Sequence, residues 1–280
     1  MGKSNQFEGA VVLVTGGNRN TGLAIVKKFL AEGARVFFCA SSEASVQVGR
    51  DALTAAGFDP ARWTGVACDV GSKDEVEALY DVIARDAGRL DVVVSNAAAF
   101  GLGQGGPLDM TEEQFLSVLN TNLLGCYRVV RAAAKRFFLN QERDPYTNQR
   151  GVVVVVGSNS SERVSRNRTS YVAAKGGMDS LVKSLGVDLG PMGIRVNMVA
   201  PGIIRTSRWD ALSDEIVAQR RASTCIGRES TGEDVAEAVA FLASPGARTF
   251  QGARLVQDGG VTAQLLPASC EDDTSKMKER

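Results

Sequence analysis

The chain has 280 residues, of which 44% are hydrophobic and 23% charged, a balance typical of a globular protein. Its 32 basic and 32 acidic residues cancel, so the composition predicts neither a nucleic-acid partner nor an anionic membrane surface. The chain contains no histidine, which excludes a serine hydrolase with a histidine base, an HExxH metalloprotease and most zinc sites.

Two further features bear on compartment and metal content. The longest aliphatic run, Val152 to Val156, is far too short to span a membrane, and the opening residues MGKSNQ contain no apolar signal-peptide core. The five cysteines are scattered, odd in number and without a CxxC pair, which argues against a disulfide framework and a thiolate metal site. We therefore expect a cytoplasmic protein with no membrane partner and no metal.

The chain alternates between strands and helices. It opens with a β-branched run from Ala10 to Thr15, and apolar side chains then recur at helical spacing from Gly22 to Glu32. Six further strands are predicted near residues 35–39, 63–68, 91–95, 151–156, 195–200 and 255–258. Val-rich strands separated by helices predict an α/β fold, a doubly wound parallel sheet of seven strands with helices on both faces, or Rossmann fold.

Local signals describe the organisation around this sheet. Ser72 and Glu75 have the spacing of a capping box at the start of a helix. A long insertion, Ser207 to Gly227, separates the sixth strand from the next helix. No linker divides the chain, so we expect a single domain over residues 1–266 and a polar C-terminal tail over residues 267–280.

The turn after the first strand, Thr15 to Gly22 (TGGNRNTG), leads directly into a predicted helix. In a parallel sheet such a turn presents backbone N–H groups and the positive helix end to a pyrophosphate. Glycine-rich turns also occur for structural reasons alone, so the weight of the motif comes from its place between a strand and a helix. It indicates a dinucleotide-binding and catalytic domain.

Tyr171 and Lys175 lie four residues apart in YVAAK, and Ser158 ends the fifth predicted strand 13 residues before the tyrosine. Residues four apart share one helix face, so the hydroxyl and the ammonium can converge on one ligand. The ammonium charge favours the tyrosinate form, which gives proton transfer without histidine. A YxxxK match also occurs by chance on amphipathic helices, so the interpretation depends on the other motifs.

From residue 7 to residue 262 the chain resembles the short-chain dehydrogenase/reductase family, in the form with a TGxxxGxG turn and a YxxxK pair. The resemblance depends on motifs that follow one another in a fixed order. Besides the turn, Ser158, Tyr171 and Lys175, these are Asp69–Val70, SNAA (Ser95 to Ala98), Asn122 in NLLG, PGIIRT (Pro201 to Thr206) and DGG (Asp258 to Gly260).

The resemblance implies an oxidoreductase that moves a hydride between a nicotinamide dinucleotide and a secondary alcohol or ketone. It makes Tyr171 the general acid and base, while Lys175 assists it and holds the nicotinamide ribose. Ser158 would bind the substrate oxygen. Asn122 would kink its helix and hold a water that connects Lys175 to solvent.

The resemblance also places the cofactor. Asp69 would meet the adenine, Asn96 and Ala97 the adenosine ribose, and Ile204 and Thr206 the nicotinamide carboxamide. Besides Tyr171 and Lys175, the expected cofactor-binding residues are Gly16, Asn18, Arg19, Asn20, Thr21, Gly22, Ser41, Asp69, Val70, Asn96, Ala97, Ala98, Pro201, Gly202, Ile204 and Thr206.

Two motifs depart from the family pattern. Asn20 replaces the usual middle glycine of the turn, and in SNAA the residues Ser95 and Ala98 replace the usual asparagine and glycine. Asparagine adopts left-handed backbone angles more readily than most other residues, so we expect the turn to survive.

Charge distinguishes between the two dinucleotides. An acidic side chain at the end of the second strand would accept both ribose hydroxyls of NAD and repel a 2′-phosphate. The chain has Ala40, Ser41 and Ser42 there. Arg19 can pair with the phosphate, although the second arginine usual in the family is missing. The sequence therefore favours NADP (NADPH) over NAD.

The substrate is not predicted, because the family varies most in the segments 100–106, 159–167 and 207–227. The mixture of apolar residues and arginines in the last segment suits a hydroxysteroid with a carboxylate, a sugar or sugar acid, or a keto-acyl thioester. Arg163, Arg166 and Arg168 form either a positive rim for an anionic substrate or, as we favour, a solvated surface.

Ala173, Gly176 and Gly177 would let the same helix of another subunit approach closely, and relatives commonly form dimers or tetramers through this helix, so we expect a homo-oligomer. Two other function classes stay open: a regulatory protein that senses NADP without turnover, and an isomerase or dehydratase on the same fold. An enoyl reductase is less favoured, because those relatives space the tyrosine and lysine more widely.

Overall fold

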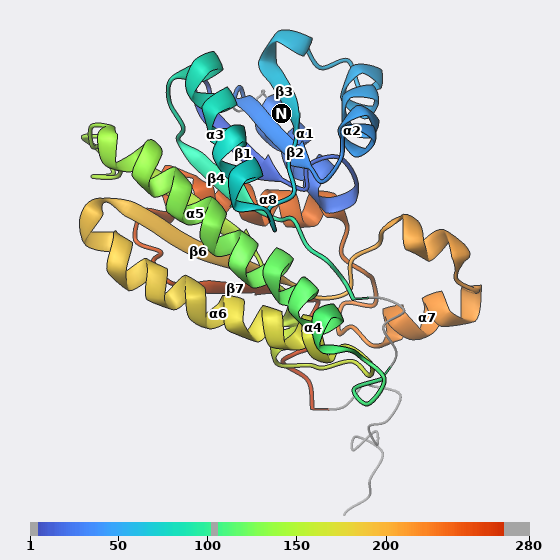
Figure 1. Ribbon diagram of the computed structural model, residues 1–280. Coiled ribbons are helices and arrows are strands. Elements are labelled where there is room, and N and C mark those ends of the chain that lie inside the picture. Colours follow the sequence, from blue (N-terminus) through green and yellow to red (C-terminus); the bar gives the residue numbers. More distant parts are fainter. Residues whose placement is uncertain (1–4, 102–105, 266–280) are drawn as a thin grey trace, which may run out of the picture.

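The computed structural model describes residues 5–101 and 106–265, and strands and helices alternate along them (Figure 1). The strands are β1 (Val11–Thr15), β2 (Arg35–Ala40), β3 (Trp63–Ala67), β4 (Val92–Ser95), β5 (Gly151–Val156), β6 (Ile194–Pro201) and β7 (Arg254–Gln257). The helices are α1 (Asn20–Ala31), α2 (Glu43–Ala55), α3 (Lys73–Ala87), α4 (Glu112–Leu119), α5 (Gly125–Arg136), α6 (Thr169–Leu189), α7 (Asp214–Ala222) and α8 (Gly232–Ala243). Every predicted strand is present to within one residue at each end. The predicted tail, 267–280, lies outside the described residues.

The seven strands form one parallel sheet in the order β3-β2-β1-β4-β5-β6-β7. The chain runs outward from β1 to β3 and then returns to the other side of β1 with β4. The connections that follow β1 and β4 therefore lead in opposite directions, which opens a crevice at their carboxyl ends. The predicted doubly wound fold is confirmed, with Thr15 and Ser95 at this crevice.

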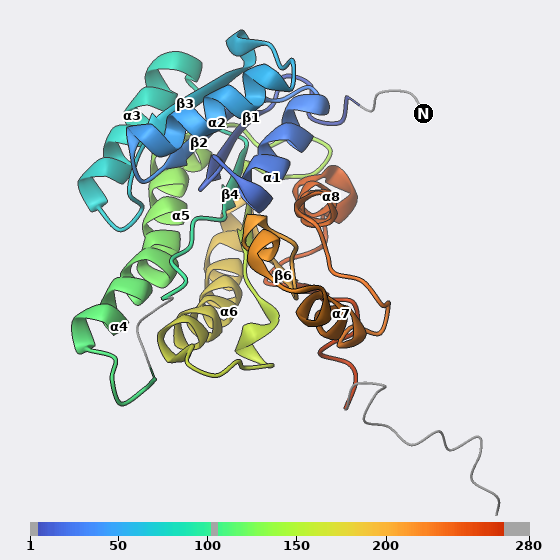
Figure 2. The same ribbon diagram turned by 90° about the vertical axis from the view of Figure 1, so that its right-hand side faces the viewer.

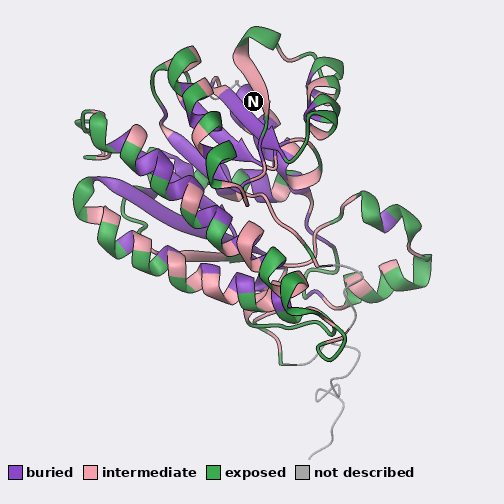
Figure 3. Ribbon diagram, viewed as in Figure 1, coloured by how far each residue is buried: buried purple, intermediate pink, exposed green. Residues whose placement is uncertain are grey.

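Helices cover both faces of the sheet (Figure 2). Alternate strand residues face opposite sides. Val12 and Val14 pack in one core with α1 and α8, whereas Val11 and Leu13 pack in the other with α3, α5 and α6. Figure 3 shows the buried sheet between these layers. Because both faces are buried, the strands consist of continuous apolar runs.

The predicted capping box at the start of α3 is only half formed. The Ser72 side chain accepts a hydrogen bond from the Glu75 N–H at 3.4 Å. The Glu75 carboxylate, however, accepts from the N–H of Asp69 at 2.8 Å. It thereby holds the loop after β3, which places Asp69 at the carboxyl end of that strand.

The long insertion between β6 and α8 has structure of its own. A 3-10 turn, Ser207–Ala211, leads into α7, whose first turn is capped by Ser213. Figure 1 shows α7 apart from the helices that cover the sheet. Among the described residues, no helix is both long and apolar enough to cross a membrane.

Candidate active site

The turn between β1 and α1 has a backbone path that side chains would obstruct. Gly16 has a φ of 65°, and a Cβ on Gly22 would lie 2.0 Å from the carbonyl oxygen of Gly16. Asn20 has a φ of 47°, the left-handed conformation expected at this position. The turn therefore leaves room for a ligand to approach the backbone closely, which fits a pyrophosphate.

The start of α1 is free to meet an anion. Arg19 precedes the helix and makes no side-chain capping hydrogen bond, and the first turn of α1 contains no acidic residue. The N–H groups of that turn and the positive end of the helix dipole are therefore not neutralised from within the helix. Together with the glycine turn, this end of α1 has the form of a phosphate site.

Asn96 links the ends of the two strands that flank the crevice, β1 and β4. Its Nδ2 donates to the carbonyl oxygens of Thr15 at 2.9 Å and of Gly16 at 3.2 Å. The Thr15 hydroxyl oxygen accepts from the N–H groups of Asn96 and Ala97, both at 3.0 Å. These bonds join the ends of β1 and β4, so the Asn96 amide nitrogen braces the turn, and a cofactor contact would have to come from its other polar atoms.

Asn122 lies in a π-helical segment, Asn120–Leu124, between α4 and α5, which is the helix irregularity expected there. It is 1% exposed. Its Oδ1 accepts from the N–H of Ala99 at 2.7 Å and its Nδ2 donates to the Ala99 carbonyl at 2.9 Å. Asn122 thus holds the segment after β4 in place. Because these bonds engage Oδ1 and Nδ2, a water that connects Lys175 to solvent would have to bind a different group of the π-helical segment.

Lys175 lies beneath the predicted catalytic tyrosine. It is 2% exposed, and its Nζ donates to the carbonyl of Val156 at 2.9 Å and lies 5.6 Å from the ring centre of Tyr171. Val156 ends β5, and two residues further the Ser158 hydroxyl accepts from the N–H of Ser160 at 3.0 Å and donates to its hydroxyl at 2.9 Å. The ends of β5 and α6 therefore bring Ser158, Tyr171 and Lys175 to one place.

Tyr171 has aromatic and cationic neighbours. Its ring stacks on that of Phe100, with centroids 5.5 Å apart and an interplanar angle of 13°. The guanidinium carbon of Arg168 lies 5.5 Å from the Tyr171 ring centre, and that of Arg208 lies 4.0 Å from the Phe100 ring centre. The neighbouring Arg163 and Arg166 are exposed, as expected of a solvated surface, whereas the place of Arg208 was not predicted from the sequence.

The segments after β6 and β7 lie side by side. The N–H of Gly202 donates to the carbonyl of Gln257 at 3.1 Å, and a Cβ on Gly202 would lie 2.5 Å from that of Asp258. Ile204 forms a parallel bridge to Ser230. The PGIIRT motif, with Pro201 and Thr206 at its ends, is therefore held against the body of the protein next to DGG.

The adenine end of the predicted cofactor site carries little negative charge. Ala40 ends β2, and the exposed Ser41 and Ser42 follow it. Glu43, the first carboxylate after the strand, pairs with Arg50. The remaining predicted contacts all follow the carboxyl ends of β1, β3 and β4: Asn18, Thr21, Asp69, Val70 and Ala98.

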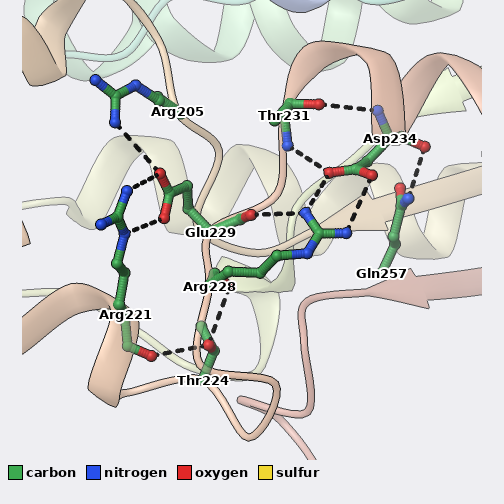
Figure 4. Close-up of polar contacts among 8 residues, drawn as sticks. All are labelled: Arg205, Arg221, Thr224, Arg228, Glu229, Thr231, Asp234 and Gln257. Atoms are coloured by element: carbon green, nitrogen blue, oxygen red, sulfur yellow. Dashed lines mark hydrogen bonds and ion pairs between the residues drawn. The ribbon is translucent and has the colours of Figure 1, made fainter. Parts of the chain in front are cut away.

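An ion-pair network that the sequence did not reveal fixes the insertion (Figure 4). Glu229 accepts from Nε and Nη2 of Arg221 at 2.7 and 2.9 Å and from Arg205 at 3.4 Å. These contacts, chiefly those of Arg221, lower the pKa of Glu229 to about 2. Arg228 pairs with Asp234 at 2.9 Å and donates to the Glu229 carbonyl at 3.1 Å. The network joins α7, the PGIIRT segment and the start of α8.

Comparison with known proteins agrees with this geometry. A model of the family described as enoyl-(acyl carrier protein) reductase matches residues 16–262. The 3-oxoacyl-[acyl-carrier-protein] reductase FabG of Vibrio cholerae is 33% identical over 256 residues, which cover 91% of this chain and 98% of that protein. Among solved structures, one titled crystal structure of gox2181 has a TM-score of 0.83 and 30% identity, and covers 94% of this chain and 99% of its own.

A second solved structure carries the family in its title. The short-chain dehydrogenase/reductase, glucose/ribitol dehydrogenase, from Brucella melitensis has a TM-score of 0.80 and 26% identity over 91% of this chain and 98% of its own. This chain belongs to the short-chain dehydrogenase/reductase family. It is an oxidoreductase of that type, which acts on alcohol or keto groups with a nicotinamide dinucleotide. Within the described residues, no group of three His, Cys, Asp or Glu side chains is placed to hold a metal ion.

Proposed function

We propose that this short-chain dehydrogenase/reductase reduces the keto group of a 3-oxoacyl compound to a secondary alcohol, with Tyr171 as proton donor. The observation that supports the proposal is the buried ammonium of Lys175, which lies 5.6 Å from the Tyr171 ring centre and donates to Val156, two residues before Ser158 at the end of β5. A buried lysine beside a tyrosine ring is typical of a catalytic site rather than of a solvated helix face. The substrate class follows the name of the Vibrio cholerae relative.

The proton path uses this chain's own side chains. The Ser158 hydroxyl turns from Ser160 toward the ketone oxygen and donates a hydrogen bond to it. The Tyr171 hydroxyl gives its proton to the same oxygen, and the Lys175 ammonium stabilises the tyrosinate that remains. A bound nicotinamide dinucleotide supplies the hydride that the carbonyl carbon receives. Lys175, with N–H groups beyond the one engaged by Val156, also holds the ribose.

We propose NADP as the preferred cofactor. The end of β2 has no carboxylate to accept the ribose hydroxyls of NAD, and Glu43 is already paired with Arg50. Arg19 is exposed, and no ion pair engages it in the part of the chain that the structure describes. A planar guanidinium beside the turn suits a 2′-phosphate.

We also propose a homo-oligomer assembled through the π-helical segment, α5 and α6. A shallow apolar groove there is lined by Leu123, Leu124, Tyr127, Gly177 and Leu181, with two serines. Leu124 and Tyr127 are 42% and 40% exposed. A contiguous apolar surface of this kind marks a protein–protein contact more often than a free surface, and a glycine in the groove allows close helix approach.

Free thiols support the cytosol as the proposed compartment. Cys39 and Cys68 are buried neighbours and both are unoxidised. Their hydrogen bond and their burial raise the pKa of the Cys68 thiol well above its usual range. Such thiols are inert packing groups, and a reducing compartment keeps them so.

A substrate comparison tests the proposed reaction. Acetoacetyl-coenzyme A, crotonyl-coenzyme A and ribose are each offered with NADPH, and oxidation of the cofactor is followed by absorbance. We expect turnover of the keto thioester and none of the crotonyl compound. Faster turnover of crotonyl-coenzyme A would support the enoyl reductase suggested by the family description, and reduction of the sugar alone would contradict the acyl substrate.

A further inference from the structure

Three side chains from separate segments lie at the stacked rings of Phe100 and Tyr171: Phe100 itself, Arg168 over Tyr171 and Arg208 over Phe100. Phe100 follows β4, Arg168 is the N-cap residue of α6, and Arg208 lies in the 3-10 turn Ser207–Ala211 of the insertion. Arg168 and Arg208, here called the arginine pair, each lie over a ring of the Phe100–Tyr171 stack. Arg168 also donates to the carbonyl of Phe100 at 2.7 Å. Arg168 is half-buried and Arg208 is exposed, yet both guanidiniums are placed by contacts with the ring stack that includes Tyr171.

No acidic side chain in the described part of the chain pairs with the arginine pair. In residues 5–101 and 106–265, no carboxylate forms an ion pair with Arg168 or Arg208. Other arginines near the carboxyl end of the sheet do have carboxylate partners: Arg205, Arg221, Arg228 and Arg254. The pattern leaves positive charge concentrated at the catalytic tyrosine.

Electrostatics supports the same conclusion. Burial lowers the pKa of Arg208, and the positive charges of Arg168 and Arg19 lower it further. Like charges that lie within reach of one another and lack a counter-ion repel, and a bound anion would relieve this repulsion. Asp210, two residues from Arg208, does not form an ion pair with it among the described residues. Within residues 5–101 and 106–265 no carboxylate pairs with the two guanidiniums, which suits the binding of an anionic ligand.

We propose that Arg168 and Arg208 bind an anionic group of the substrate, a carboxylate, within a few bonds of the ketone that Tyr171 protonates. This inference rests on the proposed function and names, among 3-oxoacyl compounds, the free 3-oxo acid as the preferred substrate, so that a 3-oxoacyl thioester is reduced but less efficiently. Two guanidiniums can hold one carboxylate by charge-assisted hydrogen bonds while their planar faces stay on the aromatic rings.

The position of the arginine pair distinguishes the proposed substrate carboxylate from the phosphate groups of an acyl carrier. In an acyl thioester the carboxyl group is masked, and the nearest phosphate is separated from the ketone by the long pantetheine arm. The guanidinium carbon of Arg168 instead lies 5.5 Å from the ring centre of Tyr171, and that of Arg208 lies 4.0 Å from the ring centre of Phe100, which stacks on Tyr171. A phosphate attached directly to a small ketone would share the chemistry of the carboxylate, so the test includes one.

The experiment compares ketones that differ only in charge. Acetoacetate is matched with ethyl acetoacetate, and dihydroxyacetone phosphate with dihydroxyacetone, in the full-length protein with NADPH. We expect the wild type to favour acetoacetate over its ester. Arg168→Gln and Arg208→Gln should each lower kcat/KM for acetoacetate by about ten-fold to a hundred-fold, mostly through KM, and change the ester little. Preference for the phosphate over acetoacetate would overturn the carboxylate assignment.

Two control variants distinguish a direct contact between the arginine pair and the substrate carboxylate from a long-range effect of positive charge. Arg166→Gln removes the same charge from the same loop, at an exposed residue that touches neither ring, and should leave the preference for acid over ester intact. Arg208→Lys keeps the charge and should recover part of the loss. If the arginine variants treat acid and ester as the wild type does, the anion site is contradicted, while reduction of the ester keeps the proposed function intact.

Binding without turnover tests the site separately. Butyrate carries the carboxylate but no ketone, and calorimetric titration into the NADP-loaded protein measures its affinity. We expect binding that weakens by about ten-fold in Arg208→Gln. Equal binding in the wild type and both glutamine variants would overturn the anion site, whatever the activity. Loss of all ketone reduction with butyrate binding preserved would instead contradict the proposed reaction.

Discussion

The proposed proton transfer depends on single residues, and the sequence revealed those residues whose roles depend on a fixed spacing. Tyr171 and Lys175 are four residues apart on one helix, so their convergence follows from helical geometry, and the structure shows Nζ 5.6 Å from the ring centre. Phe100 and Arg208 escaped notice because they come from different loops. Only the tertiary fold stacks Phe100 on Tyr171 and places Arg208 over Phe100, and no spacing along the chain indicates these contacts.

The choice of cofactor is tested at one residue. Arg19→Ala should raise KM for NADPH by about ten-fold or more and leave KM for NADH nearly unchanged, because the lost bonds are to the 2′-phosphate alone. Steady-state kinetics with both cofactors measures the ratio. Arg163→Ala, at an exposed arginine outside the turn, is the matched control. An equal change for both cofactors in Arg19→Ala would contradict the proposed phosphate contact.

At the scale of elements, periodicity and turn residues predicted nearly the whole fold. All seven strands agree with the prediction. For β1, β4 and β5 the reason is that buried parallel strands are continuous apolar runs, whereas the edge strands β3 and β7 are only partly buried. The capping box at Ser72 was only half right, since the Glu75 carboxylate found a nearer N–H donor at Asp69. The helix α7 within the insertion was not predicted. It buries no residue, so its sequence has no apolar face from which a helix could be recognised.

Glu229 holds the insertion in place, and we predict that removing its charge lowers the free energy of unfolding. Glu229→Gln should lower the free energy of unfolding at pH 7 by about 1–3 kcal/mol, because Arg221 loses a charged acceptor at a buried carboxylate. The same substitution at the exposed Glu237, which pairs with Lys28, should cost less than about 1 kcal/mol. Urea unfolding measures both, and equal costs would contradict the role of Glu229.

The pH dependence of this difference follows from the lowered pKa. The ordinary pKa of a glutamate carboxyl is 4.5, and that of Glu229 in the folded protein is about 2, so its stabilisation is fully present above pH 4.5. It is lost as the pH falls from 4.5 toward 2, where the wild-type carboxyl takes up a proton. The gap between wild type and Glu229→Gln should therefore be constant from about pH 8 to about pH 5 and shrink below.

At the scale of the whole molecule, the apolar groove formed by the π-helical segment, α5 and α6 is the surface that we propose to be covered by a second copy of the chain. Leu124→Asp should shift the protein toward monomers, because a carboxylate in an apolar contact remains unpaired. Val48→Asp, on α2 across the sheet and 53% exposed, is the matched control and should leave the assembly unchanged. Sedimentation velocity measures both, and an unchanged mass for Leu124→Asp would contradict the proposed interface.

The central claim is that Tyr171 delivers the proton, and one substitution tests it most directly. In Tyr171→Phe, turnover of the best ketone with NADPH is measured together with cofactor binding by fluorescence titration. We predict a loss of kcat of at least about a hundred-fold, in the range of a general acid, with cofactor affinity nearly unchanged because the Lys175 contacts remain. Activity close to that of the wild type, with the cofactor bound, would contradict the account.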